Sequence, residues 1–145
     1  MARINNGRVV AGGLAAGLVI NAAEILSASV FASQYEEMFA GLNLPPMGTG
    51  SLVALVVGGF AIGVILTWTY AAMRSRFGPG PKTALYAGLV VWSLGWLWQM
   101  VVDVATGFYT LSLWMWGMAI VWTFVEVQLA ALIGGWLYRE GDGPV

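Results

Sequence analysis

Apolar residues fill four long blocks of this chain, and short polar segments separate the blocks. The blocks cover about residues 9–31, 51–73, 83–104 and 113–138. A helix of about 20 apolar residues crosses a hydrocarbon core about 30 Å thick, so each block predicts one membrane-spanning helix. The blocks leave no room for a separate soluble domain. The sequence therefore predicts an all-α fold, a transmembrane four-helix bundle that forms a single domain over residues 1–145.

The composition agrees with this prediction and argues against several classes of function. Of the residues, 59% are hydrophobic and 9% are charged, whereas a soluble domain carries about 25% charged residues. Because the chain has no His and no Cys, it lacks the usual ligands of haem and of iron-sulfur clusters. Two intramembrane glutamates are few ligands for a hard cation, and no pair of nucleophile and base stands out. We expect no metal, no cofactor and no enzyme activity.

The basic residues predict the orientation of the bundle. All six fall in segments on one side of the predicted membrane: Arg3, Arg8, Arg74, Arg76, Lys82 and Arg139. The positive-inside rule then places both termini and the loop between the second and third blocks in the cytoplasm. In that loop, Arg74, Arg76 and Lys82 are expected to face the headgroups of the lipid bilayer. A net charge of −1 gives no support for nucleic-acid binding.

The first outer loop is long enough to hold an element of its own. Its sequence "ASQYEEMFAGLNLPPMGTG" predicts a short helix that Gly41 and the prolines at 45 and 46 would end. One face of this helix is apolar, so it would lie on the membrane surface, either as an interfacial anchor or as a lid over a cavity. The residues of that face are Tyr35, Met38, Phe39 and Leu42.

Glycines four residues apart predict close helix packing. Gly13 and Gly17 form such a pair in the first block, and Gly59 and Gly63 form one in the second. Pairs of this kind let backbones approach where lipid provides no hydrophobic drive for helices to associate. Packing inside one bundle accounts for both pairs, and a homodimer face is the alternative.

Polar residues inside the blocks predict a buried cluster. In "LVINAAEILSA", Asn21 and Glu24 share a helical face with the glycines of the first block, so Glu24 is expected to point into the bundle. Glu126 of the fourth block reaches a similar depth, and the two carboxyls lean toward each other. Gln99 of the third block could lie level with Glu24, whereas Asp103 reaches the outer interface and is expected to be solvated.

The acids of this cluster have no cation beside them in the predicted spans. A buried carboxyl without a cationic partner takes up a proton, and two neighbouring carboxyls favour this further. We therefore expect Glu24, Glu126 or both to be protonated at neutral pH. A protonated carboxyl could clamp helices together by donating a hydrogen bond, or it could belong to a proton path through the membrane.

Two resemblances add to this interpretation. The segment "WTYAAMRSRFGPGPKTALYAG", with "NLPPMG" before it and "WLYRE" at the end, resembles a group of uncharacterised bacterial proteins with four predicted spans. That resemblance implies the fold and a bacterial origin, and together with the four predicted spans it leads us to expect the bacterial inner (cytoplasmic) membrane. The layout also resembles small multidrug-resistance exporters, in which a glutamate of the first span exchanges protons for cationic drugs. Those exporters are shorter, lack the long outer loop, and have no second intramembrane glutamate such as Glu126.

Two functions follow from these patterns. The leading hypothesis is a non-enzymatic structural or accessory protein, which packs as a subunit in a larger membrane complex or as a homodimer. The alternative is a proton-coupled transporter of small cationic or amphipathic compounds. A cavity that reaches Glu24 or Glu126 would favour transport. A dry bundle with both carboxyls bonded to neighbouring helices would favour the structural role.

Overall fold

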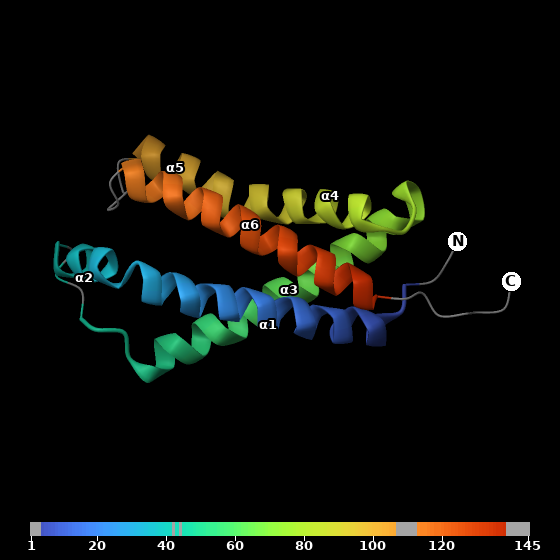
Figure 1. The fold of residues 1–145 in the computed structure, drawn as a ribbon, viewed down its shortest axis with the longest axis horizontal. Coiled ribbons are helices and arrows are strands. Elements are labelled where there is room, and N and C mark those ends of the chain that lie inside the picture. Colours follow the sequence, from blue (N-terminus) through green and yellow to red (C-terminus); the bar gives the residue numbers. More distant parts are fainter. Residues whose placement is uncertain (1–3, 42, 44, 107–112, 139–145) are drawn as a thin grey trace, which may run out of the picture.

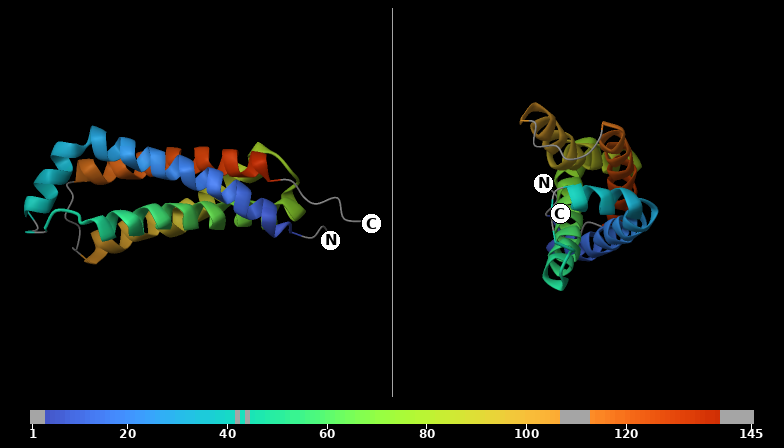
Figure 2. Two further views of the ribbon diagram at one scale, coloured as in Figure 1. Left: turned by 90° about the horizontal axis from the view of Figure 1, so that it is seen from below. Right: turned by 90° about the vertical axis from the view of Figure 1, so that its left-hand side faces the viewer.

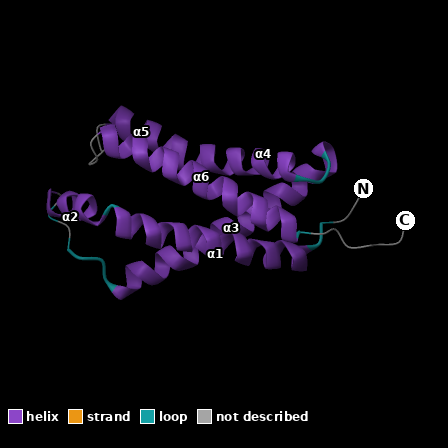
Figure 3. Ribbon diagram, viewed as in Figure 1, coloured by secondary structure: helices purple, strands orange, loops and turns teal. Residues whose placement is uncertain are grey.

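The computed structural model describes residues 4–41, 43, 45–106 and 113–138, and every regular element in these residues is a helix (Figure 3). Six segments are α-helical, and η1 is a π-helix that joins α4 to α5. The elements are α1 (Asn6–Val30), α2 (Ala32–Gly41), α3 (Thr49–Phe77), α4 (Pro81–Trp92), η1 (Ser93–Leu97), α5 (Trp98–Thr106) and α6 (Leu113–Leu137). The all-helical class predicted from the sequence is confirmed.

Four helices of the structure are long and apolar enough to cross a membrane. Each overlaps one predicted block and begins or ends a few residues from it: Asn6–Val30, Thr49–Phe77, Pro81–Thr106 and Trp114–Leu137. The third is continuous through α4, η1 and α5. Large apolar side chains cover the outside of these helices, among them Leu18, Ile25, Leu55, Val57, Leu94 and Val121. A surface of this kind suits lipid rather than water.

The four long helices lie side by side and share two ends (Figures 1 and 2). At one end, here called the termini end, α1 begins, α6 ends and the α3–α4 corner turns. At the other end, called the α2 end, the short helix α2 lies across the bundle. The sequence predicted a short helix in this segment, and α2 confirms it. Leu42 of its predicted apolar face lies outside the described residues.

The closest helix contact joins α1 to α3 through glycines. A Cβ atom on Gly13 would lie 2.5 Å from the Cα of Val64, and one on Gly63 would lie 2.8 Å from the Cα of Gly17. Real Cβ atoms do not approach other atoms so closely, so only glycine fits at these points. On the neighbouring face of α1, Gly12 meets the backbone of Gly134 in α6. Helix α1 is therefore close enough to contact backbone atoms of both α3 and α6.

Hydroxyl groups of two tyrosines hold the termini end together. The Tyr70 hydroxyl accepts a hydrogen bond of 3.2 Å from the backbone N–H of Gly80, in the α3–α4 corner. The Tyr138 hydroxyl accepts one of 3.3 Å from the N–H of Asn5, before α1. The two rings pack edge to face, with their centroids 6.0 Å apart. Gly80 has a φ of 128°, a conformation that favours glycine, which is why the corner needs it.

Adding one methyl group tests the glycine contact between α1 and α3. We expect Gly63→Ala to lower the free energy of unfolding by about 1–3 kcal/mol, because its Cβ would meet backbone atoms that cannot rotate away. The matched control is Gly58→Ala in the same helix, where nothing lies within 4 Å of the new atom. Thermal melting of both variants in maltoside detergent, followed by circular dichroism, measures the difference. Equal melting curves would contradict the proposed contact.

Candidate functional site

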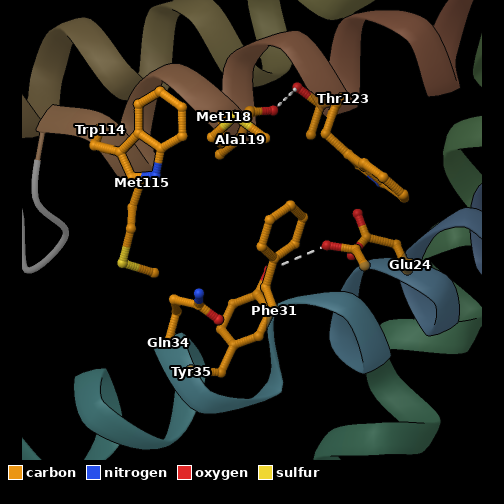
Figure 4. A pocket seen from close by; sticks show the side chains of 11 residues that line it. Glu24, Phe31, Gln34, Tyr35, Trp114, Met115, Met118, Ala119 and Thr123 are labelled. Carbon is orange, nitrogen blue, oxygen red and sulfur yellow. Dashed lines mark hydrogen bonds between the residues drawn. The ribbon is translucent and has the colours of Figure 1, made fainter.

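A cavity of about 90 Å³ lies at the α2 end, between the last turns of α1, helix α2 and the first half of α6 (Figure 4). Its walls are largely aromatic and thioether side chains: Phe31, Tyr35, Trp114, Trp122, Met115 and Met118. The chain turns at Phe31, where α1 ends, so that α2 folds back beside the cavity. The ring of Phe31 packs edge to face on Trp122, with 5.9 Å between the centroids. This contact joins the turn to α6.

Glu24 is the one acid among the described residues that line the cavity. It has no hydrogen-bond partner among those residues, and the indole N–H of Trp122 has none either, whereas the hydroxyl groups of the lining are engaged. The hydroxyls of Ser27 and Tyr35 share a hydrogen bond of 3.4 Å, and the Thr123 hydroxyl donates one of 2.8 Å to the Ala119 carbonyl. Glu24 is exposed in the structure, not buried as the sequence predicted, and its carboxyl is a free acceptor beside the cavity.

Glu126 lies on α6, one helical turn beyond the cavity residue Trp122. Its side chain is only 2% exposed, and neither carboxyl oxygen has a hydrogen-bond partner among the described residues. Leaving such a group unpaired in an apolar interior is costly. Glu24 lines the cavity together with Trp122 and Thr123, which precede Glu126 by four and three residues on α6. The structure therefore brings together the two acids that the sequence placed at similar depth.

Asn21, the third residue of the predicted cluster, links α1 to α3 by a hydrogen bond. Its amide donates hydrogen bonds to two carbonyls, that of Gly17 at 2.8 Å and that of Val56 at 3.2 Å. The same amide lies against Gly59, where a Cβ atom would come within 2.7 Å of its nitrogen. The glycine makes room for the amide. Asn21 thus contacts α3, whereas Glu24 points to the cavity beside α6.

Gln99 is not brought to the two glutamates. It is exposed and donates a hydrogen bond of 2.8 Å to the carboxylate of Asp103, one turn further along α5. In an unbroken α-helix, Gln99 would lie on the same face as Gly88 and Trp92, but η1 intervenes. A π-turn holds about one extra residue, which rotates everything beyond it by roughly 100°. Gly88 and Trp92 before η1 are buried accordingly, and Gly95 within it meets no atom within 4 Å.

The basic residues near the α3–α4 corner have different surroundings. The Arg74 guanidinium lies over the ring of Tyr138, 5.7 Å from its centroid, and donates to the Tyr138 carbonyl at 3.5 Å. Arg76 and Lys82 are exposed, and the Lys82 ammonium lies 5.8 Å from the centroid of Tyr86. Arg74 is therefore also a packing residue of the termini end, a role that the sequence did not predict.

Two further polar contacts escaped the sequence analysis. Gln128 is buried on the α4 side of α6; oriented to suit both its amide atoms, it donates to the Leu85 carbonyl at 3.1 Å and accepts from the Leu89 N–H at 3.2 Å. It fits there because Gly88 has no side chain. The indole N–H of Trp92 donates to the Thr123 hydroxyl at 3.2 Å. Gly88, the small residue opposite Gln128, is the feature of the sequence that could have indicated the first contact.

Models of known protein families, curated proteins and solved structures give no match to this chain. Among the described residues there is no group of three or more His, Cys, Asp or Glu side chains that could hold a metal ion. Chemically, the site offers one free carboxyl facing an aromatic cavity and a second, unpaired carboxyl behind it. Such a pair can bind a cation or exchange a proton.

Replacing Glu126 tests whether the acid contributes to stability. We expect Glu126→Leu to raise the free energy of unfolding by about 1–3 kcal/mol, because it removes a buried polar group that has no partner. Asn21→Ala provides the contrast, since loss of its bond to the Val56 carbonyl should cost about 1 kcal/mol. Thermal melting in detergent measures both. A clear loss of stability in Glu126→Leu would make Glu126 an interhelical clamp.

Proposed function

We propose that this chain is a multi-pass protein of the bacterial cytoplasmic membrane, with both ends of the chain and the α3–α4 corner on the cytoplasmic side. Four span-length helices with an apolar outside support insertion. The orientation follows from the basic residues, of which Arg8, Arg74, Arg76 and Lys82 belong to the described termini end, while Glu36 and Glu37 lie on α2.

Within that setting, the function that the geometry supports best is proton-coupled transport of small cationic or amphipathic compounds. The supporting observation is Glu126, an acid that is almost fully buried, unbonded, and next to the cavity acid Glu24. Intramembrane acids are expensive, and they mark ion or proton paths. Hydrogen bonds between the helices come from other residues, namely Asn21, Trp92 and Gln128. The acids are therefore free for exchange.

A structural or accessory role is the second candidate, and one observation favours it. At the α2 end, residues 49–57 of α3 are all exposed, and Gly50 and Gly58 meet no atom within 4 Å. Small residues left open on a membrane helix suit contact with another helix. This face of α3 would then contact a subunit of a larger membrane complex or a second copy of the chain. In that case the two acids would either exchange protons as proposed above or have no functional role.

The orientation can be tested by labelling, because the chain has no native cysteine. Glu37→Cys and Ser75→Cys both introduce an exposed thiol, the first on α2 and the second near the α3–α4 corner. In intact spheroplasts, a membrane-impermeant maleimide is expected to label Glu37→Cys at once and Ser75→Cys only after permeabilisation. Labelling of both from outside, or of neither, would refute the proposed topology. The unsubstituted protein is the blank.

Transport can be tested in proteoliposomes that contain a fluorescent pH indicator. With the wild-type protein, addition of quaternary or tertiary amines from a panel is expected to drive proton movement across the vesicle wall. Glu24→Gln and Glu126→Gln keep the side-chain shape but cannot ionise, so each is expected to reduce this flux to the level of empty vesicles.

The matched control for transport is Glu36→Gln, which removes an acid of α2 that is exposed and does not line the cavity. It is expected to retain the wild-type flux. If both intramembrane variants transported as well as Glu36→Gln, the acids would have no part in coupling. If no compound drove proton movement in the wild-type protein, the accessory role would be favoured instead.

A further inference from the structure

We propose that the bundle holds one anionic phospholipid at a specific place on its outside. The headgroup contacts Arg76 and Lys82, and an acyl chain lies in a groove between α3 and the third span (α4, η1 and α5). Two features of the surface support this site: an open apolar groove at the depth of acyl chains, and two exposed cations in line with it. The site rests on the proposed membrane insertion and is independent of transport.

The groove has a volume of about 490 Å³. It forms because α3 and the third span meet at the α3–α4 corner and diverge toward the α2 end (Figure 1). Side chains of both line it, among them Ile62, Ile65, Thr69, Val90, Leu94 and Trp96. The one hydroxyl among the described lining residues, that of Thr69, already donates a hydrogen bond of 2.8 Å to the Ile65 carbonyl. An apolar groove that is open to the bilayer suits an acyl chain.

The depth of the groove matches one leaflet of a bilayer. At about 1.5 Å per residue along α3, Thr69 and Ile62 lie about 10 and 21 Å from Arg76. On α4, Val90 lies about 12 Å from Lys82. Half of a bilayer, with its headgroups, measures about 20–22 Å. A lipid whose headgroup lies at the two cations therefore extends its chains along the groove as far as the middle of the membrane.

The two cations lie in line with the groove. A step of seven residues along a helix returns to nearly the same face, so Thr69 and Arg76 belong to one stripe of α3. On the exposed side of α4, steps of four residues lead from Lys82 through Tyr86 to Val90. The Lys82 ammonium lies 5.8 Å from the centroid of the Tyr86 ring. One lipid can therefore contact both cations and the groove below them.

The charge at this corner suits an anionic headgroup. Arg76 and Lys82 are exposed, and the described acids lie away from them, on α2, on α5 and within the first and fourth spans. Cations near a membrane surface attract anionic lipids. Between the cations and the groove, the rings of Phe77 and Tyr86 pack edge to face, 5.7 Å between centroids. Tyrosine is common where headgroups meet hydrocarbon.

Native mass spectrometry of the whole protein tests which lipid is retained from detergent micelles that contain two lipids in equal amounts. We expect one molecule of dioleoyl phosphatidylglycerol per chain, and about fivefold less retention of zwitterionic dioleoyl phosphatidylethanolamine. Dihexanoyl phosphatidylglycerol has the anionic headgroup, but its chains are too short to fill a groove that begins about 10 Å from Arg76. It is expected not to displace the dioleoyl lipid. Equal retention of the two dioleoyl lipids, or displacement by the short-chain lipid, would overturn the proposal.

Charge variants locate the headgroup. Arg76→Gln and Lys82→Gln are each expected to weaken retention of dioleoyl phosphatidylglycerol about fivefold, because each removes one cation beside the headgroup. The matched control is Arg8→Gln, which removes an exposed cation of the termini end from α1, a helix that contributes no residue to the groove. It is expected to retain the lipid as the wild-type protein does. Equal retention in all three variants would refute the headgroup site, and circular dichroism melting checks that each variant folds.

A groove variant locates the acyl chain without changing a charge. Ile65 lines the groove and is 55% exposed, so the larger side chain of Ile65→Trp is expected to occupy part of the groove and lower retention about fivefold. Val57→Trp is the control, at a 61% exposed position of α3 outside the groove. Equal retention in the two variants would refute the groove as the chain site. A lipid-free dimer in the same spectra would show that a second copy covers this face, and would also overturn the proposal.

The lipid site and the proposed function can fail separately. Maleimide labelling decides the topology, and proton movement in vesicles decides transport; neither readout measures retained lipid. If phosphatidylglycerol is retained in a manner that depends on Arg76 and Lys82 while no compound drives a flux, transport fails and the lipid site stands. If a flux depends on Glu24 and Glu126 while neither dioleoyl lipid is preferred, transport stands and the lipid site fails.

Discussion

The backbone contact of α1 with both α3 and α6 is the constraint on which the rest of the bundle depends. Gly13 and Gly17 let α1 reach α3, and Gly12 lets its other side reach Gly134 of α6. Helices in lipid gain no hydrophobic energy by associating, so this closeness must supply van der Waals contact instead. It also fixes the rotation of α1. The same rotation that turns the glycines inward sets Asn21 against α3 and Glu24 toward α6.

The polar groups of the interior divide into two kinds. Asn21 and Gln128 each reach a backbone carbonyl on a neighbouring helix, and a glycine at the contact, Gly59 or Gly88, makes the approach possible. These amides stabilise the bundle. Glu126 is more deeply buried than either amide, yet it has no partner among the described residues. A group that costs stability without forming a bond is what a functional site is expected to contain.

Much of the fold, and part of the site, follows from the sequence. Long apolar blocks predict the spans because length and hydropathy alone decide whether a helix can cross lipid. Spacing and depth also bring Glu24 and Glu126 together, since both lie on regular α-helix. The position of Gln99, in contrast, was not predicted correctly. The segment "SLGWL" contains no pattern that predicts a π-helix. Because that turn holds one extra residue, Gln99 points away from the acids. The cavity could not be predicted from the sequence either, because its walls come together only through the turn at Phe31.

The order of the two acids along the bundle bears on the proposed mechanism. Glu24 lines the cavity, whereas Glu126 lies one turn deeper on the facing helix, away from the α2 end. A cation that pairs with Glu24 therefore need not compete with a proton on Glu126. Their mutual repulsion disfavours the state in which both are charged and unpaired. Binding a cation at the first acid removes that repulsion, and releasing the cation restores it. In the proposed transport mechanism, the pair would couple the occupancy of the cavity to a proton on Glu126. A single intramembrane glutamate could couple the two only by binding either the cation or the proton.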